Sequence, residues 1–194
     1  MTSELPSYWD APDPGDYPYP DTHDLRVGPP LHKAVQRLLP FIGVWRGRGG
    51  GQYSTVEPFE FAQEIRISHD GRPFVAYESR AWLVTPDGEQ IRPAAREVGW
   101  WRPITDADGK PTNEIEALFC TPTGIMELYI GRIDGVKLEM STDAVMRTAT
   151  AKEVTAGQRL YGIVDRDLLY AQDLAAMGQP LSNHLAARLR RIAG

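Results

Sequence analysis

The feature that most constrains the fold of this chain is a long series of alternating apolar and polar residues. In the segment YSTVEPFEFAQEIRIS, for example, Phe59 and Phe61 alternate with Glu60 and Glu64. A repeat of two is that of a β-strand whose faces lie in different environments. Similar segments follow one another through most of the chain, which predicts an all-β protein.

Turn signals separate these segments. Asp-Gly between two alternating runs is a strong β-hairpin signal, because glycine readily adopts the positive φ that tight turns require. About ten short antiparallel strands joined in this way predict an up-and-down β-barrel of the calycin-like kind, with room for one small ligand. A β-sandwich is the alternative on pattern alone. The signals are Asp70-Gly71, Asp87-Gly88, Asp108-Gly109 and Asp134-Gly135.

Two short helices and an arm complete the predicted organisation. Residues 31–39 carry apolar residues at helical spacing, and Pro40 is expected to end that helix. A second short helix is expected at the C-terminus, where Pro180 is placed to begin a turn. Residues 1–29 are rich in Pro and Asp and are predicted to be a disordered or extended arm. Residues 30–194 are predicted to form the barrel domain.

Composition excludes several classes of function. The net charge of −5 gives no sign of a nucleic-acid-binding surface. One cysteine, Cys120, allows neither a disulfide within the chain nor a cysteine-based metal site, and it is interpreted as a small apolar strand residue. No apolar run reaches the length of a membrane span, and no secretory leader is recognised. The expected location is cytoplasmic, with no membrane or nucleic-acid partner.

The glycine-rich segment GVWRGRGGGQY has the most unusual composition in the chain. A phosphate-binding loop requires a strand before it and a helix after it, whereas here a helix precedes and a strand follows. We therefore interpret it as a first barrel strand that bends sharply or that a flat ligand approaches. Trp45 is expected to pack at one end of the barrel, with its N–H bound to a carbonyl.

The chain resembles the nitrobindins, haem-binding β-barrels also called peroxynitrite isomerases. Gly43, Trp45, Gly47 and Gly49 are similar to their Gly-x-Trp-x-Gly-x-Gly signature, and GQPLSNHLAARLRR is similar to their C-terminal segment. YSTVEPFEF, GRPFVAYESR, PTGIMELYIG and TATAKEVT extend the resemblance over about residues 31–192. One departure is Ser54, where close relatives are expected to carry proline.

This resemblance implies a cofactor and three site residues. The family binds haem b, and the resemblance implies one per subunit with His184 as the axial ligand of the iron. Thr55 matches a threonine that lies close to the haem in the family. Lys152 is implied, less directly, as a partner of a haem propionate. A neutral imidazole beside an apolar cleft suits this role, and Asn183 or a backbone carbonyl is expected to orient the ring.

The remaining ionisable residues are given structural roles. His69 is expected in a hairpin turn that points away from the interior, and no inward strand position is expected to hold a histidine. The haem face opposite His184, the distal side, would then carry no imidazole to donate a hydrogen bond. Bound oxygen needs such a hydrogen bond more than nitric oxide does, so this arrangement favours nitrogen-oxide chemistry over oxygen storage. Hydrolysis would require two carboxylates that converge inside the barrel, and the sequence identifies no pair that must do so. Strand carboxylates that alternate with apolar residues are expected on the solvated face: Glu60, Glu64, Glu78, Glu114 and Glu116.

Three functions follow from these observations. The first is a haem enzyme that isomerises peroxynitrite to nitrate at ferric iron and also binds nitric oxide. The second is a haem-free carrier of a fatty acid or another small apolar ligand, which would usually hold an Arg or Tyr inside to meet a carboxylate. The third is an interaction module that contacts a partner through the aromatic N-terminal arm. The sequence leaves both a monomer and a homodimer open.

Overall fold

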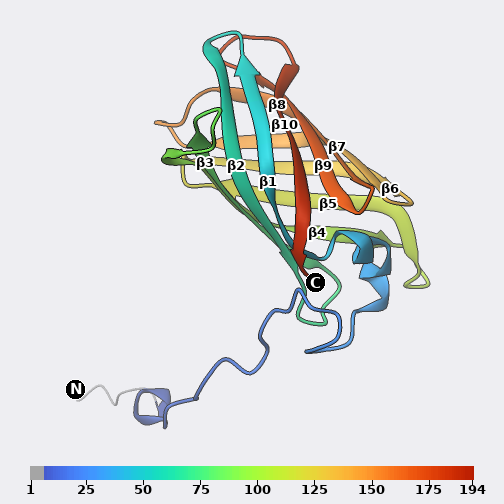
Figure 1. Cartoon of the computed structure of the whole chain (residues 1–194). Coiled ribbons are helices and arrows are strands. Elements are labelled where there is room, and N and C mark those ends of the chain that lie inside the picture. Colours follow the sequence, from blue (N-terminus) through green and yellow to red (C-terminus); the bar gives the residue numbers. More distant parts are fainter. Residues whose placement is uncertain (1–6) are drawn as a thin grey trace.

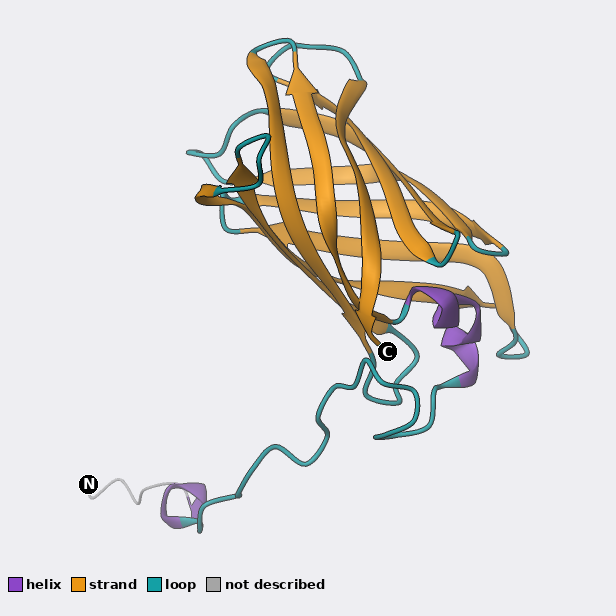
Figure 2. Ribbon diagram, in the orientation of Figure 1, coloured by secondary structure: helices purple, strands orange, loops and turns teal. Residues whose placement is uncertain are grey.

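The computed structural model describes residues 7–194, of which residues 43–193 form one closed ten-stranded barrel (Figure 1 and Figure 2). Every strand is antiparallel to both neighbours, and β1 pairs with β10 to close the ring. Closure gives each of the ten strands a neighbour on both sides, although β7 and β8 pair only over Lys137–Ser141 of β7. The strands are β1 Gly43–Tyr53, β2 Val56–Ser68, β3 Val75–Val84, β4 Gln90–Thr105, β5 Pro111–Thr121, β6 Ile125–Asp134, β7 Lys137–Arg147, β8 Val154–Val164, β9 Asp167–Ala176 and β10 Ser182–Ala193.

The barrel prediction is confirmed, and closure of the ring excludes the sandwich. The predicted C-terminal helix is wrong, because that segment is β10 and pairs with both β1 and β9. Leu181, Leu185 and Leu189 are four residues apart, a spacing that fits a helix and a strand equally well. Inward Ala187 and outward Arg188 reveal the repeat of two in the burial pattern of β10.

A 3₁₀ helix, η2 Lys33–Phe41, covers one end of the barrel, where the sequence predicts the first helix. Its N-cap is His32, whose Nδ1 accepts a hydrogen bond from the Ala34 N–H at 3.1 Å. The sequence predicts that Pro40 ends this helix. Pro40 instead lies inside η2, which continues for one more residue, to Phe41. Within the described residues, no helix combines the length and apolar character of a membrane span.

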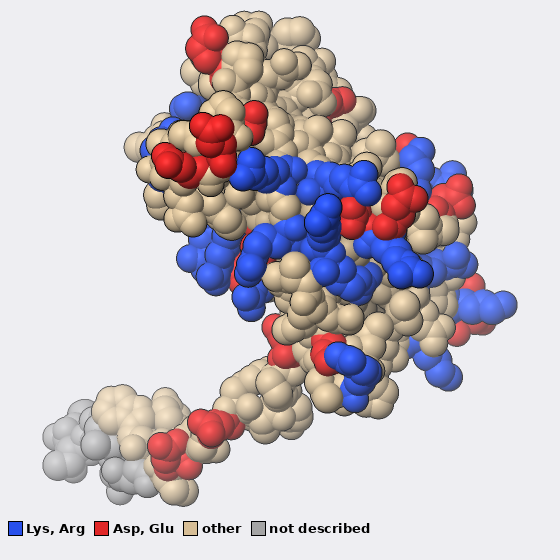
Figure 3. All heavy atoms as spheres, viewed as in Figure 1, with Lys and Arg blue, Asp and Glu red and all other residues tan. Residues whose placement is uncertain are grey.

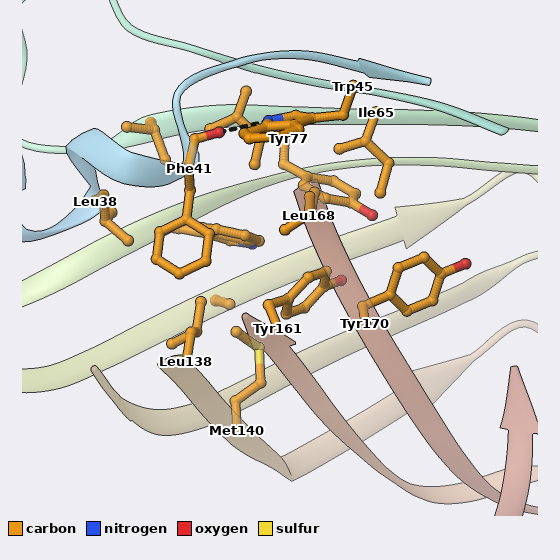
Figure 4. Packing of buried hydrophobic residues seen from close by; sticks show 14 of the residues in the cluster. Leu38, Phe41, Trp45, Ile65, Tyr77, Leu138, Met140, Tyr161, Leu168 and Tyr170 are labelled. Atoms are coloured by element: carbon orange, nitrogen blue, oxygen red, sulfur yellow. Dashed lines mark hydrogen bonds between the residues drawn. The ribbon is translucent and has the colours of Figure 1, made fainter. Parts of the chain in front are cut away.

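The core lies between η2 and the barrel wall (Figure 4). Trp45 is fully buried, and its Nε1–H donates to the Phe41 carbonyl at 2.8 Å, which confirms the role predicted for it. The guanidinium of Arg191 lies 4.2 Å from the Trp45 ring centroid and donates to the carbonyls of Pro40 and Ile42. These contacts tie the last strand, the first strand and the end of η2 together.

The N-terminal segment extends away from the barrel (Figure 1). A 3₁₀ turn, η1 Ser7–Asp10, lies near its start, and residues 1–6 of the predicted arm lie outside the described residues. The segment reaches the barrel at Thr22, whose backbone exchanges two hydrogen bonds with His69. His69, predicted as an outward turn residue, is instead 2% exposed, because the incoming chain covers it.

His69 makes stability depend on pH. Burial lowers the pKa of His69 below its ordinary 6.5, although Asp70 and Asp21 oppose the change. The folded state therefore resists protonation, and its stability is fully present above about pH 6.5 and declines as the pH falls below it. Urea unfolding between pH 7.5 and 5.5 is expected to show a shallower decline for His69→Gln than for wild type. Equal slopes for the two proteins would contradict this assignment.

Candidate functional site

The candidate site is built around a β-bulge in β10. Asn183 pairs with Asp173 and Leu185 pairs with Gln172, so His184 is an extra residue without a partner on β9. A bulge interrupts strict alternation and redirects the side chain that it carries. His184 and Leu185 therefore both line the barrel cavity, although they are adjacent in sequence.

Two groups from the end of β1 orient the His184 ring. Its Nδ1 lies 3.2 Å from the carbonyl oxygen of Gln52, and because a carbonyl only accepts, Nδ1 carries the proton. Tyr53 packs edge-on against the imidazole at a centroid distance of 5.4 Å. This arrangement leaves Nε2 with a free lone pair. The Asn183 amide donates to Asp173 instead, so the backbone carbonyl is the orienting group.

The surroundings of His184 favour its neutral form. Burial lowers the pKa of His184, and the hydrogen bond to Gln52 opposes this only in part. Neutral imidazole is the form that coordinates a metal. No group of three His, Cys, Asp or Glu side chains within residues 7–194 is placed to hold a metal ion.

Two cavities meet at His184. The larger has a volume of about 430 Å³ and a mostly apolar wall that includes Phe59, Phe61 and Leu83. The smaller has a volume of about 170 Å³ and continues into the polar interior of the barrel. Sites for small molecules and cofactors commonly occupy about 300–1,000 Å³ with mainly apolar walls. Both cavities are lined by Gln63, Ala95, His184 and Leu185.

The glycines of β1 shape the apolar cavity. A Cβ at Gly49 would lie 2.5 Å from Cζ of Phe61, and a Cβ at Gly51 would lie within 2.8 Å of three ring atoms of Phe59. These two rings line the larger cavity. The glycine-rich strand therefore makes room for aromatic rings of β2, which form part of the cavity wall.

The wall of the smaller cavity includes a charged cluster that the sequence does not predict. The Arg159 guanidinium donates two hydrogen bonds to Glu97, at 2.6 and 2.7 Å, and one to Glu127 at 3.0 Å. The side chain of Arg159 is only 3% exposed. No converging pair of carboxylates is identified from the sequence, whereas Glu97 and Glu127 do converge on Arg159 inside the barrel. Burial alone would lower the pKa of Arg159, but Glu97 raises it above its ordinary value, so the guanidinium stays charged.

Hydroxyl groups surround this cluster. Tyr129 donates to Glu127 at 3.0 Å, and Tyr170 donates to the Gln63 side chain at 2.7 Å. Gln63 in turn donates to the Ser79 hydroxyl at 2.7 Å. Burial raises the pKa of both tyrosines, so they remain protonated donors. Of the lining residues, His184 is the sole histidine in either cavity.

Two residues implied by the resemblance lie near the cavities without lining them. Thr55 is exposed in the β1–β2 turn, next to Val56, which lines the larger cavity. Lys152 is exposed in the β7–β8 loop, two residues before Val154, which lines the smaller one. Their roles toward a haem remain predictions, as does the role of His184.

The sequence matches a family described as the THAP4-like, heme-binding beta-barrel domain over residues 34–191. A protein named peroxynitrite isomerase from Salinispora tropica is 61% identical over 189 residues, which cover 97% of this chain and 96% of that protein. A protein of the same name from Streptomyces griseus is 44% identical, with 91% of this chain and 93% of that protein covered.

Two further relatives agree with this match. A ferric nitrobindin-like protein from Saccharopolyspora erythraea is 40% identical, covering 98% of this chain and 86% of that one. The crystal structure of Rv2717c from M. tuberculosis superposes with a TM-score of 0.71 at 36% identity, covering 83% of this chain and 98% of that one. The resemblance to nitrobindins is thus confirmed, and the chain belongs to the THAP4-like family of haem-binding β-barrel domains.

Proposed function

We propose that this protein binds one haem b through His184 and isomerises peroxynitrite to nitrate. The observation that carries the proposal is the oriented, neutral imidazole of His184 at the edge of an apolar cavity. The names of the relatives from Salinispora and Streptomyces support the same reaction. A bound ferric haem would supply the iron centre at which the oxygen–oxygen bond of peroxynitrite is rearranged.

The chain's own residues would hold and surround the cofactor. The carbonyl of Gln52 fixes the tautomer of His184, and Tyr53 restricts rotation of its ring. Tyr53 is itself held, because its hydroxyl accepts from the Ala176 N–H at 2.8 Å. Phe59 and Phe61 provide an apolar wall that keeps water from one part of the cavity.

The residues present fit a haem. A single neutral imidazole with one free nitrogen is the least that five-coordinate haem iron requires from a protein. An apolar wall suits the macrocycle, while exposed Thr55 and Lys152 lie at loops that border the cavities. We keep Thr55 as a neighbour of the haem and Lys152 as a propionate partner within this proposal.

Titration of the purified apoprotein with haemin tests the proposal. Wild type is expected to develop a sharp Soret band, and His184→Ala is expected to lose it, because no other histidine lines the cavities. Asn183→Ala is the matched control, and it should leave the band intact because the Asn183 amide donates to Asp173, whereas the His184 ring is held by Gln52. Equal haemin affinity in wild type and His184→Ala would overturn the role of His184. Stopped-flow decay of peroxynitrite then tests the reaction itself.

The fatty-acid carrier is the weaker alternative. Such a carrier needs an interior cation free to meet a carboxylate, and the interior does hold Arg159. Two glutamates already neutralise that guanidinium, so a ligand carboxylate would meet a net negative cluster. Native mass spectrometry distinguishes a bound lipid from a haem by mass.

Nitric oxide binding and a cytoplasmic location complete the proposal. Nitric oxide needs no hydrogen bond from the distal side, which agrees with cavities that hold no second histidine. A cytoplasmic location agrees with a single free cysteine. Optical titration of ferrous and ferric haem-loaded protein with nitric oxide checks the first of these.

A further inference from the structure

The smaller cavity beside His184 has a negatively charged wall. Its buried charged side chains are those of Glu97, Glu127 and Arg159, two carboxylates against one guanidinium. One further charged residue lines this cavity, Arg96, but its side chain is exposed and binds a carboxylate on β3. The buried part of the wall therefore holds more negative than positive charge.

Each oxygen of the two carboxylates accepts a hydrogen bond. The Arg159 guanidinium donates to both oxygens of Glu97 and to Oε2 of Glu127. The Tyr129 hydroxyl donates to Oε1 of Glu127. A protonated carboxyl group would instead carry an O–H that donates. Both glutamates are therefore ionised, and the cluster as a whole carries one net negative charge.

Charges on the outside of the barrel act on this cavity more weakly. Figure 3 shows basic side chains gathered over the lower barrel in this view. Exposed arginines such as Arg46 on β1 and Arg188 on β10 have side chains that are 54% and 58% exposed, and each binds a carboxylate. Salt screens exposed charges over about 10 Å at 0.1 M but screens buried charges much less. The interior cluster is therefore the charge that acts most strongly on the cavity.

The group that orients His184 adds no negative charge of its own. In many metal sites a carboxylate binds the ligand histidine and raises its basicity. Here Nδ1–H of His184 donates to the carbonyl of Gln52, which is neutral. The carboxylate of Asp173 on the neighbouring strand accepts from Asn183 instead. Negative charge next to the imidazole thus comes from the interior cluster.

Such a charge changes the redox equilibrium of a metal centre bound in the same cavity. Reduction of ferric to ferrous haem adds one electron, and a neighbouring negative charge opposes that addition. For two unit charges about 10 Å apart at an effective dielectric constant of about 20, the effect is about tenfold. Burying an ion cluster is costly, and apolar side chains often serve stability equally well. A role in tuning the cofactor explains why this barrel holds charges inside.

We propose that the cluster of Glu97, Glu127 and Arg159 lowers the reduction potential of the bound haem and so holds the iron in the ferric state. Ferric iron is the state that the proposed isomerisation uses, so the inference rests on the function proposed above. The three residues act on the iron through their net charge and are positioning residues, not catalytic ones.

Redox titration of the haem-loaded full chain provides the test, with the Soret band followed as the ambient potential is changed. Glu127→Gln removes one negative charge, keeps an oxygen that can accept from Tyr129, and leaves both hydrogen bonds between Arg159 and Glu97 in place. At the midpoint potential of wild type, this variant is expected to show a ferric-to-ferrous ratio about tenfold lower.

Two further variants separate charge from structure. Glu97→Gln/Glu127→Gln/Arg159→Leu has different side chains but, like Glu127→Gln, a cluster without net charge, so both should share one midpoint potential above that of wild type. Glu116→Gln is the matched control. Glu116 lies on β5 with a side chain that is 38% exposed and paired with Arg102, and its loss should leave the potential unchanged.

The possible results distinguish this inference from the proposed function. An unchanged midpoint potential in Glu127→Gln, with an intact Soret band, would overturn the role of the cluster and leave haem binding in place. Different potentials in the two variants without net charge would overturn it too, because the effect would then belong to packing or solvent access. A wild type that develops no Soret band would overturn both proposals.

Discussion

Arg159→Leu is expected to lower the free energy of unfolding by about 3–5 kcal/mol, the usual effect of removing one partner from a buried ion pair. Glu97 and Glu127 would remain as two carboxylates with no cation between them. Their side chains are 14% and 6% exposed, so water could hydrate them only in part. The ring of Phe119 would also lose the guanidinium that lies 4.0 Å from its centroid. Urea unfolding monitored by tryptophan fluorescence measures the change.

A triple variant shows whether charge or packing causes that loss. In Glu97→Gln/Glu127→Gln/Arg159→Leu no buried charge remains, so most of the lost stability should return. A further loss in the triple variant would instead assign the effect to packing. A stability of Arg159→Leu within about 0.5 kcal/mol of wild type, as for an ordinary surface substitution, would show that the cluster is hydrated.

The barrel could be predicted because its signals are local. Period-two alternation and Asp-Gly turns define each hairpin, and Trp45 occupies the position expected at the end of the barrel. The C-terminal strand was missed because its leucines recur every four residues, which fits a strand as well as a helix. Only pairing with β1 and β9 decides between them.

The candidate site was predictable in part. His184 was found through a resemblance, whereas the bulge that redirects it and the Gln52 carbonyl that orients it depend on register. Alternation does place Glu127 on the same side of its strand as Tyr129, and Arg159 on the side of Tyr161. Glu97 on β4, Glu127 on β6 and Arg159 on β8 meet across the interior, although no two of these strands are neighbours in the barrel. Hairpin signals carry no information on such contacts.

Gly49→Val is expected to destabilise the protein by about 3 kcal/mol, at the upper end for overpacking of a well-packed core. The new Cβ would lie 2.4 Å from the carbonyl oxygen of Ala186, a backbone atom that cannot rotate away. It would also push the Phe61 ring, 2.5 Å from the same Cβ, toward the cavity that it lines. Thermal unfolding of the apoprotein and haemin titration should therefore both report a loss.

Gly50→Ala is the matched control for this substitution. Gly50 is the next residue of the same strand, but a Cβ there meets its first neighbour, the Phe59 carbonyl oxygen, only at 4.0 Å. Alanine at this position should leave haemin binding unchanged and should raise stability slightly, since it restricts the unfolded chain more than glycine does. If both variants behaved alike, the signature glycines would serve strand flexibility. If only Gly49→Val loses stability and haemin binding, the signature glycines serve the close packing of β1 against Phe61 and β10. That packing places the apolar wall beside His184.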